Sequence, residues 1–103
     1  MNPESIKPPE DCAGIEDVRR EIDALDYEII TLIGRRVHYV EAAAQFKTSE
    51  SSVRAPERQK AMLEQRRQWA EEEDLDPGVV EKIYQTLVEY FIQREMERWR
   101  VSD

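Results

Sequence analysis

The chain has 103 residues, of which 37% are charged and only three are glycine, a composition that favours one small helical domain. Its formal charge of −8 argues against nucleic acid or an anionic membrane as the main partner, and no stretch approaches the roughly 20 apolar residues that span a bilayer. A single cysteine excludes an internal disulfide framework, and the N-terminus has no apolar run typical of a signal peptide, so we expect a cytoplasmic protein.

The residue pattern in the first half of the chain predicts an extended lead-in followed by one long helix. Residues 1–11 hold three of the five prolines and are expected to be extended and partly disordered. From about Ala13 to Phe46, apolar residues recur at steps of three and four, as on one face of a helix: Ile15, Val18, Ile22, Leu25, Ile29, Leu32, Val37, Val40 and Ala44. Such a helix is about 50 Å long, longer than a globule of this size is wide. It therefore needs a partner surface, most simply a second copy of the chain.

Two shorter helices are predicted after a polar loop at residues 48–52. Pro56 suits the first turn of a helix that ends near Glu73, with four candidate buried residues, Met62, Leu63, Trp69 and Ala70. Asp76 and Pro77 form an N-cap and first-turn pair that starts a third helix, which carries Val80, Ile83, Leu87, Tyr90, Phe91 and Trp99. We therefore predict an all-α fold of one long and two shorter helices, without strands, as a single domain over residues 1–103.

Several basic residues near the apolar stripes or loop boundaries are candidates for binding a small anion: Arg19, Arg35, Arg36, Lys47 and Arg58. Arg36 follows Arg19 by 17 residues, about 260° around a regular helix after whole turns, so the two do not share a face. They converge only if one comes from a neighbouring subunit. The alternative is that each is a solvated arginine in one of the common and weak surface ion pairs.

Other polar and aromatic residues favour structural interpretations. The acidic run at residues 71–74 is interpreted as a solvated face rather than a metal site, because consecutive helical residues point apart. Trp69 and Trp99 lie at helical spacing and are interpreted as core or dimer contacts. We expect no metal site.

The order and spacing of several short motifs resemble the isochorismate-pyruvate lyases of the all-α chorismate mutase superfamily. The resemblance covers roughly residues 8 to 100 and is carried by Pro9 to Arg19, Glu21 to Asp23, Leu25-Asp26, Gly34 to Arg36, Tyr39-Val40, Ala42-Ala43, Phe46-Lys47, Ala55 to Arg58, Met62-Leu63 and Trp69 to Glu72. It implies an intertwined homodimer with two equivalent sites for a small dianion, isochorismate or chorismate.

The resemblance also assigns roles to residues of this chain. It implies that Arg19 enters the partner's site and that Arg36 binds a substrate carboxylate within its own chain. It matches Lys47 to a lysine in a loop that closes over the ligand, and Arg58 to a further arginine at the start of the second helix. These suit a dianion, because guanidinium groups bind carboxylates in a bidentate way and an ammonium can stabilise charge on an ether oxygen. Two apolar residues, Val40 and Ile92, are expected to contact the substrate as well.

The reaction that the resemblance implies is pericyclic and yields salicylate and pyruvate. It requires no nucleophile, metal or redox cofactor, so we expect none; the protein holds a folded substrate conformer and stabilises separated charge. Glu95 occupies a position where lyases of this family often have Gln, whose side chain donates a hydrogen bond near the ether oxygen. An ionised carboxylate only accepts, so Glu95 must be protonated for that role, for instance through desolvation.

Two positions favour the lyase over a chorismate mutase. Dedicated mutases of this fold tend to carry acids that help bind the ring hydroxyl of chorismate, whereas this chain has Ala55 and Gln59 there. We expect some mutase activity in the same site, because both substrates share the dianionic enol-ether geometry. Two alternatives stay open: a chorismate mutase that makes prephenate, and a non-catalytic helical dimer that serves as an interaction module.

Overall fold

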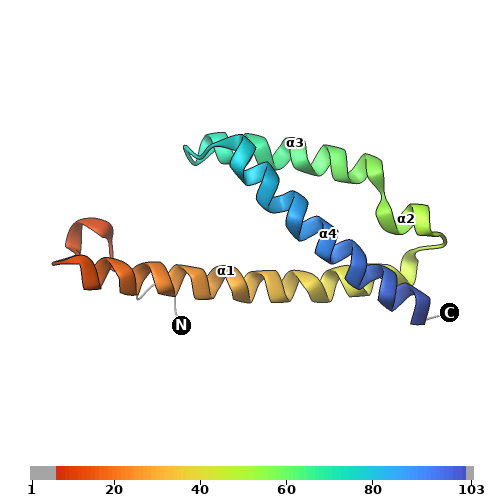
Figure 1. Ribbon diagram of the computed structural model, residues 1–103, viewed down its shortest axis with the longest axis horizontal. Coiled ribbons are helices and arrows are strands. Elements are labelled where there is room, and N and C mark those ends of the chain that lie inside the picture. The colour runs from red at the N-terminus through yellow and green to blue at the C-terminus, as the bar shows by residue number, and fades with distance from the viewer. Residues whose placement is uncertain (1–6, 102–103) are drawn as a thin grey trace. The chain divides into compact units, whose positions relative to one another are not determined.

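The computed structural model describes residues 7–101, and every regular element in that range is helical (Figure 1). The elements in chain order are η2 (Pro9–Asp11), α1 (Ile15–Ala43), η3 (Ala44–Phe46), α2 (Glu50–Arg54), α3 (Pro56–Glu72) and α4 (Pro77–Val101). The predicted class, one long and two shorter helices, is confirmed, and the short helix α2 is additional. Within this range, no helix is long and apolar enough to cross a membrane.

The chain divides into two compact units, Met1–Arg36 and Val37–Asp103. In the first unit, part of the predicted extended lead-in is a turn instead. Pro9–Asp11 forms a 3-10 turn, because the amide of Asp11 donates to the carbonyl of Pro8 at 2.9 Å and proline presets the backbone angle of such a turn. The predicted lead-in at residues 1–6 lies outside the described residues.

The first turn of α1 is capped by Asp17. Its carboxylate accepts from the backbone amide of Ala13 at 2.9 Å and from the ammonium of Lys7 at 3.2 Å. Both contacts favour the ionised form, so the pKa of Asp17 lies below its usual value. An acid at this end of the helix also complements the helix dipole and so stabilises the first turn of α1.

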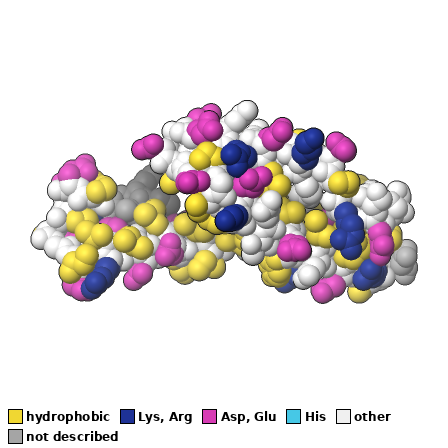
Figure 2. Space-filling view, turned by 45° about the horizontal axis from the view of Figure 1, so that its top comes forward, with side chains coloured by type: hydrophobic (Ala, Val, Ile, Leu, Met, Phe, Trp, Pro, Cys, Tyr) yellow, Lys and Arg dark blue, Asp and Glu magenta, His cyan; other side chains and the backbone are white. Residues whose placement is uncertain are grey.

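The first unit leaves the apolar face of α1 uncovered. The six residues that define this stripe are 37% to 59% exposed: Ile15, Val18, Ile22, Leu25, Ile29 and Leu32. In the space-filling view, hydrophobic side chains gather along this part of the helix (Figure 2, left). Monomeric proteins rarely expose a contiguous apolar stripe of this kind.

The second unit is organised around α4. Helix α3 packs along α4, and α2 and η3 also contact α4. The core consists of buried apolar side chains from several of these elements: Val37, Ala44, Val53, Met62, Ala70, Phe91 and Met96. The last part of α1 also lies in this unit, where Glu41 forms an ion pair of 2.7 Å with Arg94 of α4.

The starts of α3 and α4 are as predicted. Pro56 is the first residue of α3. At α4, the carboxylate of Asp76 accepts from the backbone amides of Gly78 at 2.8 Å and Val79 at 3.2 Å, which are two of the amides that lack partners inside the helix.

The prediction of a polar loop over residues 48–52 is correct for Thr48 and Ser49 but wrong for residues 50–52, because α2 begins at Glu50. Ser49 and Ser52 form a reciprocal capping box: the hydroxyl of Ser49 accepts from the amide of Ser52, and the hydroxyl of Ser52 accepts from the amide of Ser49, both at 3.1 Å. The helix ends at Arg54, and the φ of 42° at its C-cap, Ala55, is left-handed and lets the chain turn directly into α3. Serines that appear loop-forming in the sequence therefore start a helix.

Some candidate core residues are exposed in the single chain. Met62 and Ala70 are buried as predicted, and Leu63 is half-buried, but Trp69 is 46% exposed. Ile83 and Tyr90 on α4 are also exposed. The ring of Trp69 instead carries the guanidinium of Arg66, 4.5 Å from its centroid. Helical spacing identifies one face of a helix but does not identify which part of that face a neighbour covers.

Candidate active site

The structure brings together the two residues predicted to be catalytic. Lys47 follows η3, and Glu95 lies on α4, and the Lys47 Nζ is 3.8 Å from the Glu95 Oε1. The side chains are 24% and 8% exposed. Lys47 and Glu95 are 48 positions apart in the sequence, yet their charged groups face each other where solvent is partly excluded. Electrostatic interactions are stronger there than in water.

Glu95 is the buried charged residue of the described chain. Its burial raises the pKa of the carboxyl group above the usual value, and the nearby Lys47 ammonium opposes this shift only in part. A raised pKa favours the protonated form, and a protonated carboxyl group can donate a hydrogen bond. The condition for a donor role of Glu95, desolvation, is therefore present.

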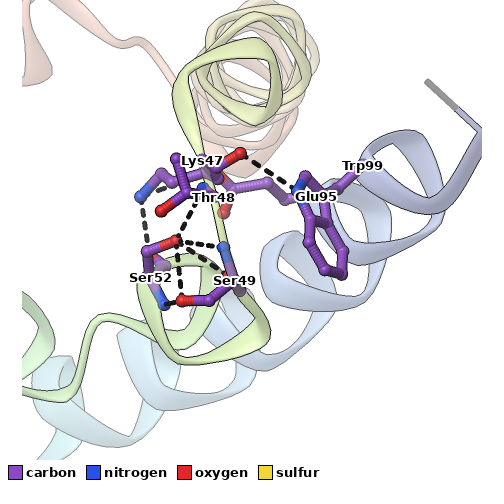
Figure 3. Close-up of polar contacts among 6 residues, drawn as sticks. All are labelled: Lys47, Thr48, Ser49, Ser52, Glu95 and Trp99. Atoms are coloured by element: carbon purple, nitrogen blue, oxygen red, sulfur yellow. Dashed lines mark hydrogen bonds and ion pairs between the residues drawn. The ribbon is translucent and has the colours of Figure 1, made fainter. Parts of the chain in front are cut away.

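Lys47 is held at both ends (Figure 3). Its ammonium donates to the backbone carbonyl of Ser52 at 2.8 Å, and its own carbonyl accepts from the indole N–H of Trp99 at 3.1 Å. The residue itself is extended, with φ −92° and ψ 141°, because the 3-10 turn η3 ends there. These contacts direct the flexible lysine side chain towards α4.

Three other predicted residues also belong to the second unit. Val40 and Ile92 are half-buried. Ile92 lines a cavity of about 280 Å³, together with six residues of α2 and α4: Arg54, Glu89, Gln93, Met96, Glu97 and Arg100. Arg58 is exposed in the first turn of α3. The lining of this cavity includes neither Lys47 nor Glu95.

The two remaining predicted residues lie on α1, in the first unit. Arg19 is exposed, and its guanidinium pairs with Glu16 at 3.2 Å, one helical turn away. Such surface pairs contribute little stability, so this contact leaves Arg19 available to another ligand at small cost. Arg36 is half-buried at the end of the unit.

Across residues 7–101, no group of three or more His, Cys, Asp and Glu side chains is arranged to hold a metal ion. The pair that the structure brings together, Lys47 and Glu95, consists of an ammonium cation beside one buried acid. Such groups bind carboxylates and stabilise charge that develops on an oxygen.

The contacts of Ser52 and Trp99 that hold Lys47 were not predicted from the sequence. The capping-box spacing of Ser49 and Ser52 was a detectable signal, since each residue type is common at the start of a helix. Trp99 lies four residues after Glu95, which places both on one face of α4. The hydrogen bond from Trp99 to the Lys47 carbonyl joins positions 52 residues apart, and no local pattern predicts it.

Comparison with known proteins relates the chain to one family. The model of the chorismate mutase type II family matches residues 18–96. The chain is 44% identical to isochorismate pyruvate lyase of Pseudomonas aeruginosa over 95 residues, which cover 92% of this chain and 94% of that protein. It is 36% identical to the T-protein of Haemophilus influenzae over 67% of this chain but only 19% of that protein. It is 29% identical to chorismate mutase of Methanocaldococcus jannaschii over 74% of this chain and 78% of that protein.

Proposed function

Because this chain belongs to the chorismate mutase type II family, we propose that it is an isochorismate-pyruvate lyase, which converts isochorismate to salicylate and pyruvate. The observation that carries the proposal is the match to the Pseudomonas lyase along nearly the whole of both chains. The partly desolvated pair of Lys47 and Glu95 supports it, because this pair supplies a cation and a potential hydrogen-bond donor at one place.

The reaction breaks the bond between the ring carbon and the ether oxygen of isochorismate. A ring hydrogen moves at the same time to the methylene carbon of the enolpyruvyl group, whose oxygen becomes the keto oxygen of pyruvate. The ring becomes aromatic and remains as salicylate, so all atoms of the substrate are found in the two products. The enzyme accelerates such a concerted step by holding a folded conformer and by stabilising charge on the departing oxygen.

We assign the substrate carboxylates to arginines, because planar guanidinium groups bind carboxylates with two parallel hydrogen bonds. Arg36 and Arg58 serve the site of their own chain, and Arg19 reaches the site of a partner chain. Val40 and Ile92 contact the apolar part of the substrate. The ammonium of Lys47 and the protonated carboxyl group of Glu95 donate to the ether oxygen as negative charge develops there.

The enzyme acts as an intertwined homodimer in this proposal, and residues 1–103 form one domain of it. The exposed apolar stripe of α1 supports this arrangement, because a second copy of the chain would cover it. A stripe that would be unfavourable in a monomer becomes the centre of a subunit interface. We place the dimer in the cytoplasm, where a chain with a single cysteine requires no disulfide.

Chorismate mutase activity is the second candidate, at a lower rate in the same site. The family match and the identity to the Methanocaldococcus mutase favour it. The positions of Ala55 and Gln59 disfavour it as the main activity, since neither side chain is an acid that could bind the ring hydroxyl of chorismate. We therefore expect both substrates to react, with isochorismate preferred.

Parallel steady-state assays on the purified protein test the proposal. Salicylate fluorescence reports turnover of isochorismate, and loss of chorismate absorbance reports turnover to prephenate. We expect a higher kcat/KM for isochorismate. A higher kcat/KM for chorismate would assign the chain to the mutases, and no turnover of either substrate would favour a non-catalytic interaction module.

Variants with matched controls test the site assignment. Lys47→Ala and Arg36→Ala should each lower kcat/KM for isochorismate by on the order of 100-fold or more, since each removes a charge-assisted hydrogen bond to the substrate. Lys60→Ala and Arg20→Ala remove an exposed lysine on α3 and an exposed arginine on α1, and should change kcat/KM less than about twofold. If kcat/KM fell as much in these controls as in Lys47→Ala and Arg36→Ala, the assignment of the site residues would be contradicted.

A further inference from the structure

Besides Glu95, two residues with no proposed catalytic role, Ser52 and Trp99, contact Lys47. One turn of α4 contacts both ends of Lys47: Glu95 faces its ammonium, and Trp99 donates to its backbone carbonyl at 3.1 Å. The indole of Trp99 thereby fixes the point at which the lysine side chain leaves the backbone. Since a lysine side chain is long and flexible, the position of its backbone determines where its ammonium can reach.

Ser52 fixes the other end. Its carbonyl accepts from the Lys47 ammonium at 2.8 Å. Its hydroxyl accepts from the backbone amides of Thr48 at 3.2 Å and Ser49 at 3.1 Å, and donates to the carbonyl of Ser49 at 2.8 Å. The half-buried hydroxyl of Ser52 therefore holds Ser52, whose carbonyl accepts from the ammonium, against Thr48 and Ser49, the two residues that follow Lys47 (Figure 3).

We propose that Ser52 and Trp99 are positioning residues, which hold the Lys47 ammonium beside Glu95 before the substrate binds. This inference rests on the proposed function, in which Lys47 and Glu95 stabilise charge on the ether oxygen. Groups that are already aimed at this oxygen need no reorganisation during the reaction. Without Ser52 or Trp99, the ammonium samples positions in solvent and the site loses its preorganised donor.

The first test measures kinetics with isochorismate. We expect Ser52→Ala and Trp99→Phe to lower kcat by about 10- to 100-fold, since a misplacement of about 1 Å has effects of this size, while KM changes much less. Ser52→Thr keeps a hydroxyl and should restore most of kcat. Ser51→Ala makes the same change on the exposed side of α2 and should leave kcat unchanged.

A double-variant comparison separates positioning from general destabilisation. In a Lys47→Ala background, Ser52→Ala should lower kcat no further, because the group that it positions is already absent. A further decrease in kcat in the Lys47→Ala background would overturn the proposal. A decrease in kcat in Ser51→Ala equal to that in Ser52→Ala would also overturn it.

A second readout needs no turnover. The pKa of Glu95, followed by NMR of its labelled carboxyl carbon, is raised by burial and lowered by the Lys47 ammonium. Ser52→Ala and Trp99→Phe should therefore raise this pKa, in the same direction as Lys47→Ala, and Ser51→Ala should not. An unchanged pKa in Ser52→Ala and Trp99→Phe would contradict positioning. If the wild-type protein fails to convert isochorismate, the proposed function is wrong, and this titration still decides whether Ser52 and Trp99 hold the ammonium.

Discussion

Replacement of Glu95 by glutamine changes a buried charged residue into a neutral side chain of nearly the same shape. Glu95 is 6% exposed, and its burial raises the pKa of its carboxyl group above the usual value of 4.5. Only the protonated acid donates a hydrogen bond, whereas the amide of glutamine donates at every pH. In the wild-type protein, kcat should therefore fall as pH rises through the pKa of Glu95, by about tenfold for each pH unit above it. Glu95→Gln should show a kcat that is independent of pH.

The assay is salicylate formation at saturating isochorismate between pH 5 and 8, with Glu64→Gln as a control that removes an exposed acid on α3. Stability gives a second measurement. Because the folded protein holds the proton of Glu95 more tightly than the unfolded chain does, this residue destabilises the fold progressively as pH rises from 4.5 through the raised pKa. Glu95→Gln removes this loss and should be the more stable protein at pH 7. A flat wild-type kcat profile, or a slope that persists in Glu95→Gln, would refute a donor role of Glu95.

Three further predictions concern the fold, each measured at a fixed protein concentration because the proposed dimer makes stability concentration-dependent. Met62 is 1% exposed, so Met62→Ala should lower the free energy of unfolding, measured in urea, by about 2–5 kcal/mol. A decrease below about 1 kcal/mol would show that the surrounding core collapses around the smaller side chain. Asp76→Ala removes the acceptor for two amides of the first turn of α4 and should cost about 1 kcal/mol in the same titration; no change would show that water replaces the cap. The pKa of Asp17 lies below 3.8, so its ionised form stabilises the fold above pH 3.8 and this stabilisation is lost as pH falls through the lowered pKa. Asp17→Asn should therefore have a lower Tm than the wild type at pH 6, with the difference closing at lower pH, and a difference that is constant with pH would contradict the role of the charge.

The sequence was sufficient to predict the three main helices because their signals are local. Steps of three and four among apolar residues predicted α1, and Pro56 and Asp76 marked the starts of the next two helices. The same reasoning failed at α2, because serines occur both in loops and at helix starts, and only the reciprocal bonds between Ser49 and Ser52 distinguish the two. A five-residue helix has too few positions for a periodic pattern to appear.

The roles of the candidate site residues stay predictions, and the contacts that hold these residues were not predictable from the sequence. Lys47 and Glu95 were expected to act together, and the structure places them 3.8 Å apart. The contacts of Ser52 and Trp99 with Lys47 were not expected, because they depend on how α2 and α4 pack. Trp69 was interpreted from its spacing as a core or dimer contact; it is 46% exposed and so is not a core residue of the single chain, since spacing does not identify what covers a residue.

The deuterium content of the pyruvate formed from isochorismate shows whether the hydrogen moves directly from the ring to the enolpyruvyl group. The substrate carries deuterium at the ring position whose hydrogen migrates, and the product is analysed by mass spectrometry after conversion in ordinary water. We expect one deuterium in the methyl group of each pyruvate, since the hydrogen moves directly from ring to methylene. Pyruvate with only solvent hydrogen in its methyl group, or no pyruvate at all, would contradict this expectation.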